Sequence, residues 1–372
     1  MTLSPSRRRL LATAVTLATA LLLPLSTARA EPFKLGGKPK IAFIYAASAK
    51  DGGWNESLDN ARRVVEKEFG VKAAVAESIA EESSAVKNAI DLFVQRGFNI
   101  IVTTTYGYSD GVLEAAKKHP GVAFLAAAGT TNAANLESFY ARTYEGWYLA
   151  GMAAAGVSTK KKLGVLGGFP VSVVNWDVNA FTRGAQAIDP STQAIVIYTN
   201  SWWDPVKEGQ VAKAMLDQGA DVIGNDLSSA GPFTAAEKAG KASVGFQLDM
   251  AKHAPKGHLT SVVFRWEKHL VPTIRKIIAG TWTPSEYGAF PGMADGVVEL
   301  TPLGAKVPAP VKAQIEAAKA KIIAGKLTPF DGPVLKQDGS TAIAAGASIT
   351  DEALWSMDYL VKGSIGSMPA TK

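Results

Sequence analysis

Short apolar segments that predict strands alternate with helical segments along most of the chain. In the first series the helical segments 55–69 and 84–98 repeat their apolar residues at helical spacing, and 109–120 follows them. They separate four segments rich in β-branched and small apolar residues, at 40–48, 71–78, 99–106 and 121–129. Strands that alternate with helices in this way predict an α/β lobe built on a doubly wound parallel sheet.

The same pattern then starts again. Predicted strands lie at 162–168, 193–200, 220–226 and 241–249, and the helical segments between them at 179–188, 204–220 and 232–240. A chain of 372 residues is too long for one ordinary core. We therefore predict two doubly wound parallel-sheet lobes, joined through 139–157, with a hinge and a cleft between the lobes.

The last third of the chain does not start a third unit. It contains a strand followed by a helix within 260–280, a strand at 296–303 and a helix at 308–327. We interpret these segments as elements that complete the two lobes, so that the chain crosses between the lobes more than once. The predicted N-terminal lobe is 31–143 plus about 263–295, the C-terminal lobe is 144–262 plus about 296–372, and the hinge includes 142–145.

The first thirty residues have the features of a secretory signal peptide. A basic start at Arg7, Arg8 and Arg9 precedes an apolar run and a small-residue end at Ala28 and Ala30. We expect cleavage near Ala30 and export to a bacterial periplasm, and the arginines also resemble a twin-arginine signal. The sequence has no cysteine, so we expect neither a disulfide nor a lipid anchor, but a soluble monomer without direct membrane insertion.

The charge balance argues against a nucleic-acid partner. The formal net charge of +6 falls to +2 without the four arginines of residues 1–30, which contain no acidic residue. No run of Lys or Arg in the remaining chain has aromatic residues between the charges. We expect no nucleic acid and a small-molecule ligand instead.

Aromatic and amide side chains follow the predicted strands. In open parallel sheets ligands lie beyond the carboxyl ends of the strands. An aromatic face that stacks on a heteroaromatic base contributes about 1–3 kcal/mol, and Asn, Gln or Asp can then read the edge of the ring. The candidate ligand-binding residues are Trp54, Asn55, Tyr106, Tyr108, Trp176, Trp202, Trp203, Asp226, Gln247 and Asp249.

Structural roles remain open for several of these residues. Trp54 could cover the start of its helix, and we expect one of the adjacent Trp202 and Trp203 to pack rather than face the cleft. Asp226 and Asp249 also suit turns after strands. Asp204, which precedes Pro205, is interpreted as a helix cap.

Motifs that would indicate catalysis are absent. The four histidines form no His-Glu-x-x-His, and the sequence has no Gly-x-Ser-x-Gly, phosphate-binding loop or Gly-x-Gly-x-x-Gly. We therefore expect a binding protein with no cofactor and no metal. The alternative from another class is an exported nucleoside hydrolase that uses Asp51, Asp226 or Asp249.

Several sequence blocks occur in one order along the chain, among them DGGWNESLDNAR, RTYEGWYLAGMAA and YTNSWWDPVKEGQVAKAMLDQGADVI. In these blocks the chain resembles the basic membrane protein family, whose members are substrate-binding proteins of ABC transporters with the type I periplasmic-binding-protein fold. The resemblance implies a purine nucleobase or nucleoside as ligand and a permease as partner. It implies that Trp54 and Asn55 form an aromatic–amide pair, that Trp202 or Trp203 is a second stacking residue, and that Gln247 or Asp249 stands at the family's acidic position.

One departure from the family pattern bears on the ligand. Nucleoside-binding members place a lysine that holds the ribose a few residues after the positions of Thr260 and Ser261. This chain has Phe264, Arg265 and Trp266 there. We therefore expect a free base such as adenine, with a purine nucleoside in the same site as the alternative; a sugar, whose ring also stacks on aromatics, is the other ligand considered.

Overall fold

The computed structural model describes residues 31–369. The predicted signal peptide and its cleavage near Ala30 lie outside these residues. Within 31–369, no helix is both long and apolar enough to cross a membrane.

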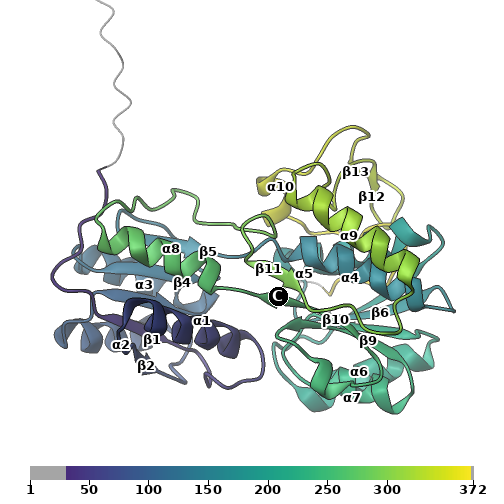
Figure 1. The fold of residues 1–372 in the computed structure, drawn as a ribbon, viewed down its shortest axis with the longest axis horizontal. Helices are drawn as coiled ribbons and strands as arrows, with labels where there is room; N and C mark the ends of the chain where they lie inside the picture. Colours follow the sequence, from purple (N-terminus) through teal and green to yellow (C-terminus); the bar gives the residue numbers. More distant parts are fainter. Residues whose placement is uncertain (1–30, 370–372) are drawn as a thin grey trace, which may run out of the picture. The chain divides into compact units, whose positions relative to one another are not determined.

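The first lobe is built on a five-stranded parallel sheet with the strand order β2-β1-β3-β4-β5 (Figure 1). Its central strands are buried at every position, because helices cover both faces of the sheet. One face packs against α2 and α3 and the other against α1 and α8. The strands are Ile41–Ile44, Ala74–Ala76, Ile100–Thr103, Ala123–Ala127 and Leu136–Phe139 (β1 to β5), and the helices are Trp54–Phe69 (α1), Ser83–Gln95 (α2), Ser109–Lys118 (α3) and Glu267–Ile278 (α8).

The second lobe has a seven-stranded sheet in the order β11-β10-β9-β8-β6-β7-β14, parallel except for β11. Helices α4 and α5 pack closely against each other, and α6 packs against α7. The strands are Lys162–Gly167 (β6), Gln193–Tyr198 (β7), Val222–Asn225 (β8), Ala242–Gln247 (β9), His258–Phe264 (β10), Val298–Leu300 (β11) and Ser364–Ile365 (β14). The helices are Thr143–Val157 (α4), Ser172–Ile188 (α5), Pro205–Asp217 (α6), Gly231–Lys238 (α7) and Ala309–Ile323 (α9).

The chain passes between the lobes three times. It leaves β5 for α4, leaves β10 for α8, and returns from α8 to β11. The first and third passages run side by side, because Tyr140 N donates to Ala289 O over 3.0 Å and Arg142 N donates to Pro291 O over 2.9 Å.

The C-terminal segment adds small elements to the second lobe. A hairpin of Val334–Leu335 (β12) and Thr341–Ile343 (β13) precedes the short helix Asp351–Trp355 (α10), and β14 then joins the edge of the sheet beside β7. Helix α10 contacts α5. The two parallel sheets with helices on both faces confirm the predicted α/β class.

Candidate functional site

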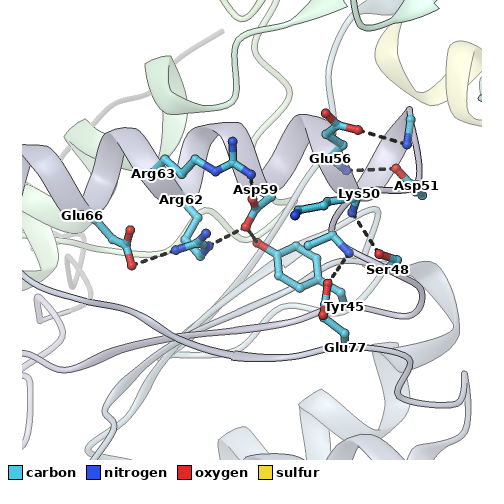
Figure 2. A network of polar contacts seen from close by, with 12 residues as sticks. Tyr45, Ser48, Lys50, Asp51, Glu56, Asp59, Arg62, Arg63, Glu66 and Glu77 are labelled. Atoms are coloured by element: carbon cyan, nitrogen blue, oxygen red, sulfur yellow. Dashed lines mark hydrogen bonds and ion pairs between the residues drawn. The ribbon is translucent and has the colours of Figure 1, made fainter.

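The start of α1 is fixed by a polar network. Asp51 accepts hydrogen bonds from the backbone N–H groups of Gly53, Asn55 and Glu56 at 2.9–3.0 Å, and so takes up the free donors of the helix start. Further along the helix, the buried carboxylate of Asp59 accepts a bond from Tyr45 and ion pairs with arginines of the same helix (Figure 2). These contacts hold the residues of the first helical turn in one orientation.

Trp54 lies in this first turn with its indole half-buried. Its Nε1 donates to Thr104 O over 2.6 Å, which ties it to the residue after β3. The ring stacks on Tyr140, with centroids 5.9 Å apart and 26° between the planes, and meets the rings of Phe264 and Trp266 edge-on. Trp54 therefore presents an aromatic surface where the first lobe meets the passages to the second.

Asn55 is held within the first lobe. Its Nδ2 donates to Asp51 over 2.8 Å, and its Oδ1 accepts a bond from Thr104 Oγ1 over 3.0 Å. The amide thus links the loops that follow β1 and β3, and each of its two polar atoms has a partner there.

Trp176 is fully buried and extends the aromatic cluster into the second lobe. Its Nε1 donates to Thr143 Oγ1 over 3.0 Å. The ring lies 6.0 Å from Tyr140, 5.5 Å from Phe290 and 5.1 Å from Trp355, centroid to centroid. Tyr140 connects this group of rings to Trp54.

Two buried carboxyl groups, Asp177 and Asp226, lie next to this cluster. Thr143 Oγ1 donates to Asp177 over 2.7 Å. Burial raises the pKa of both carboxyls well above the ordinary range, and the adjacent charge of Asp177 raises the pKa of Asp226 further. Two such groups do not both ionise easily, so a proton shared between them would stabilise the pair.

Asp226 has one oxygen, Oδ1, that is buried and has no hydrogen-bond partner among residues 31–369. Burial raises the pKa of the Tyr140 hydroxyl well above its ordinary value, and the charges of Asp177 and Asp226 raise this pKa further. A buried acceptor that no donor reaches costs about 1–3 kcal/mol.

The lobes touch at Gly53 and Gln247. A Cβ on Gly53 would lie 2.4 Å from Gln247 Oε1 and 2.4 Å from Ser228 Cβ, so only glycine fits this approach. Gln247 Oε1 also accepts a bond from Ser228 Oγ over 2.7 Å. Gln247 adopts a positive φ of 70°, which is rare for a residue with a side chain.

The remaining candidate residues do not join this cluster. Tyr108 is buried in the first lobe and donates to Ile79 O, while Tyr106 is 68% exposed. Asp249 caps the turn at Ala251 N. Trp202 and Trp203 are 51% and 59% exposed.

Trp202 packs on Phe169 with ring centroids 5.0 Å apart. It also lies near Leu227, because a Cβ on Gly168 would be 2.7 Å from Trp202 and 3.1 Å from Leu227. Asp204 caps α6 by accepting a bond from Lys207 N over 3.0 Å, which confirms its structural interpretation.

A surface pocket of about 420 Å³ lies beside the cluster. It is lined by residues of α1, the end of β9 and the end of β10, among them Gln247, Asp249 and Phe264. Arg265 also lines it, but its guanidinium is paired with Glu267 at 2.8 Å and Glu299 at 3.2 Å.

Sequence reasoning missed Tyr140, Asp177 and Thr104. Tyr140 follows β5, which was not among the predicted strands, and Asp177 lies inside a helix rather than after a strand. Thr104 was hidden within a longer predicted strand. Within 31–369, no group of His, Cys, Asp and Glu side chains has the arrangement of a metal site.

Comparisons with known proteins agree with this architecture. A purine-binding protein of Brucella abortus (strain 2308) is 36% identical over 345 residues, which cover 91% of this chain and 97% of that protein. A putative ABC transporter glucose-binding protein of Haloferax volcanii is 28% identical, over 88% of this chain and 81% of its own.

Solved structures show the same fold at lower identity. An ABC transporter solute-binding protein from Conexibacter woesei matches with a TM-score of 0.66 and 22% identity, over 78% of this chain and 98% of its own. A transcriptional activator of comK from Bacillus halodurans matches with a TM-score of 0.70 and 22% identity, over 78% and 100%. The family model described as PnrA-like ABC transporter substrate-binding protein matches residues 38–328. The chain belongs to this family of substrate-binding proteins of ABC transporters.

Proposed function

We propose that this protein is exported to the periplasm, binds a purine nucleobase of the adenine type between its two lobes, and delivers it to the permease of an ABC importer. In this proposal one lobe comprises 31–143 with about 263–295, the other comprises 144–262 with about 296–372, and the export signal is the segment that ends near Ala30. Membership of the family supports the transport role, and the name of the Brucella relative supports a purine ligand.

The unpaired Oδ1 of Asp226 carries the proposal for the ligand. When Asp226 holds the shared proton and donates it to Asp177, its Oδ1 is a carbonyl oxygen that accepts a hydrogen bond. An exocyclic amino group of a purine supplies such a donor. The half-buried rings of Trp54 and Tyr140 supply aromatic surface for the flat base, and the buried Trp176 supports Tyr140 from behind.

The residues at the passage after β10 favour a base over a nucleoside. Phe264 and Trp266 are buried and pack on Trp54, and Arg265 is paired with Glu267 and Glu299. No cation of this segment is left to hold a ribose. Closure of the lobes, with Gly53 against Gln247 and Ser228, then gives a bound ligand contacts from both sides.

A nucleoside in the same site is the second candidate. The pocket of about 420 Å³ beside Phe264 has room for a polar group attached to the base, and Gln247 and Asp249 line it. Binding of adenine therefore tests the aromatic surface alone, and binding of adenosine tests the adjoining pocket as well.

The test is calorimetric titration of the chain from Glu31, unfolded and refolded to remove carried-over ligand. The ligands are adenine, guanine, hypoxanthine, adenosine, guanosine, ribose and glucose. We expect adenine to bind most tightly, and adenosine, in which a ribose is attached to the base, to bind more weakly. Tighter binding of adenosine would show that the ligand is the nucleoside and not the free base. Binding of only a sugar would refute the purine proposal. Release of free base from a nucleoside would instead revive the hydrolase.

A further inference from the structure

The segment 348–360, which we call the C-terminal strap, lies beyond residue 328, where the match to the family model ends. It contains α10 and is bound to α5 through two asparagines that are fully buried. Asn175 Nδ2 donates to Met357 O over 2.8 Å, and Asn179 Nδ2 donates to Tyr359 O over 2.7 Å. Buried amides without partners are costly, so these bonds make the strap a built part of the second lobe.

A second attachment joins the strap to the first passage between the lobes. The guanidinium of Arg142 donates to both carboxylate oxygens of Asp351, each over 2.7 Å. Arg142 also donates to Phe290 O over 3.0 Å and lies 4.3 Å from the centre of the Phe290 ring. This bidentate geometry fixes the start of α10 relative to the passage.

The two attachments place Trp355 in the aromatic cluster. Its ring lies 5.1 Å from Trp176 and 5.1 Å from Phe290, and 6.2 Å from Tyr140 at an angle of 66°. Trp355 is still 44% exposed, whereas Trp176 is fully buried. An aromatic ring that is packed on one side and exposed on the other can contact a ligand with its exposed side.

We propose that Trp355 is a residue of the ligand site, where it contacts the bound base, and that the Arg142–Asp351 ion pair positions it. The strap thus limits the space available to the ligand from the side of α5. This inference rests on the proposed purine function, and it assigns a contact that the matched family region does not include.

The experiment uses chain 31–372 labelled with 5-fluorotryptophan, and fluorine NMR with adenine as the probe. Trp355→Phe assigns the Trp355 signal, and Trp54→Phe assigns that of Trp54. We expect adenine to shift both signals. By calorimetry, we expect Trp355→Ala to weaken adenine binding by about tenfold or more, as for loss of a stacked aromatic, and Trp355→Phe to stay within about threefold of the native chain.

Matched variants separate this role from general damage. Tyr287→Ala removes an aromatic residue that is 88% exposed and should leave binding unchanged. Without any ligand, Asp351→Asn should shift or broaden the Trp355 signal, whereas Glu352→Gln, one residue further along α10, should not. Thermal melts of each variant show whether the fold is intact.

The outcomes distinguish the two proposals. If adenine shifts the Trp54 signal but not the Trp355 signal, and Trp355→Ala binds normally, Trp355 is only structural and the inference is wrong. If adenine shifts no tryptophan signal, the proposed purine function is refuted. The proposed contact between Trp355 and the base is then refuted as well. An unchanged Trp355 signal in Asp351→Asn would refute the positioning role alone, whatever adenine does.

Discussion

Glu145 should make the protein less stable as the pH rises toward neutrality. Glu145 lies in the first turn of α4, next to the passage between the lobes, and accepts a bond from Met293 N over 2.7 Å. Burial raises its pKa from 4.5 to about 7, with Asp295 adding to the rise while the Met293 bond and Arg142 oppose it.

The raised pKa fixes the sign and size of the effect. Between pH 4.5 and 7 the folded protein holds a proton on Glu145 that the unfolded chain has lost, so stability falls as the pH rises through this window. Each unit of difference between the pKa of Glu145 in the folded and unfolded chain changes the free energy of unfolding by about 1.4 kcal/mol. The rise from 4.5 to about 7 therefore gives a full effect of about 3 kcal/mol. It is absent below pH 4.5 and complete above about pH 7.

Glu145→Gln removes this dependence and keeps a carbonyl oxygen for Met293 N. We expect the free energy of unfolding of the variant, relative to the native chain, to rise by about 3 kcal/mol between pH 4.5 and 8. Urea unfolding at half-unit pH intervals measures the difference. Glu286→Gln, at an exposed position, is the control and should give a flat difference. Parallel stability curves for the native chain and Glu145→Gln would show that Glu145 is ionised in the folded state like an ordinary glutamate.

Three further changes test the site. Gly53→Ala puts a Cβ 2.4 Å from Gln247 and Ser228 and should weaken adenine binding, by calorimetry, by about 1–3 kcal/mol, whereas Gly209→Ala, whose Cβ meets nothing closer than 3.6 Å, should not; equal effects would argue against a lobe contact in binding. Asp226→Asn removes the shared proton, so the loss of adenine affinity that we expect toward alkaline pH in the native chain, as the raised pKa values are passed, should disappear; an unchanged pH profile would place the proton elsewhere. Arg265→Ala should leave adenine binding within about threefold, because its guanidinium is paired with Glu267 and Glu299; a tenfold loss would show that Arg265 contacts the ligand.

The fold was predictable because it depends on patterns that one stretch of sequence contains. The buried runs of β1, β3 and β4 and the helical spacing of α1 and α2 are local signals. Trp54 was predicted as a site residue for the same reason, since it follows a strand and begins a helix, and its role in binding stays a prediction. The carboxyl edge of a parallel sheet is where such residues collect.

The polar part of the site was harder to predict, because it depends on contacts between distant segments. Asn55 looked like a ligand group, but Asp51 and Thr104 occupy its amide, and Thr104 is 49 residues away in the chain. Asp177 looked like an ordinary helical residue. Only the fold brings Asp177, on α5, close to Asp226, which follows β8 in the chain.

This difference explains why aromatic residues alone do not identify the ligand. Stacked rings such as Trp54 and Tyr140 offer a similar surface to a purine and to the face of a sugar, and the relatives include proteins named for each. A buried hydrogen-bonding group discriminates between ligands, because a ligand that leaves it unpaired loses about 1–3 kcal/mol of binding free energy. A flat apolar surface, in contrast, accepts rings of different shape. In our proposal the choice between base, nucleoside and sugar depends on the buried Oδ1 of Asp226 and on the pairing of Arg265 with Glu267 and Glu299, and these are the positions at which relatives with other ligands should differ.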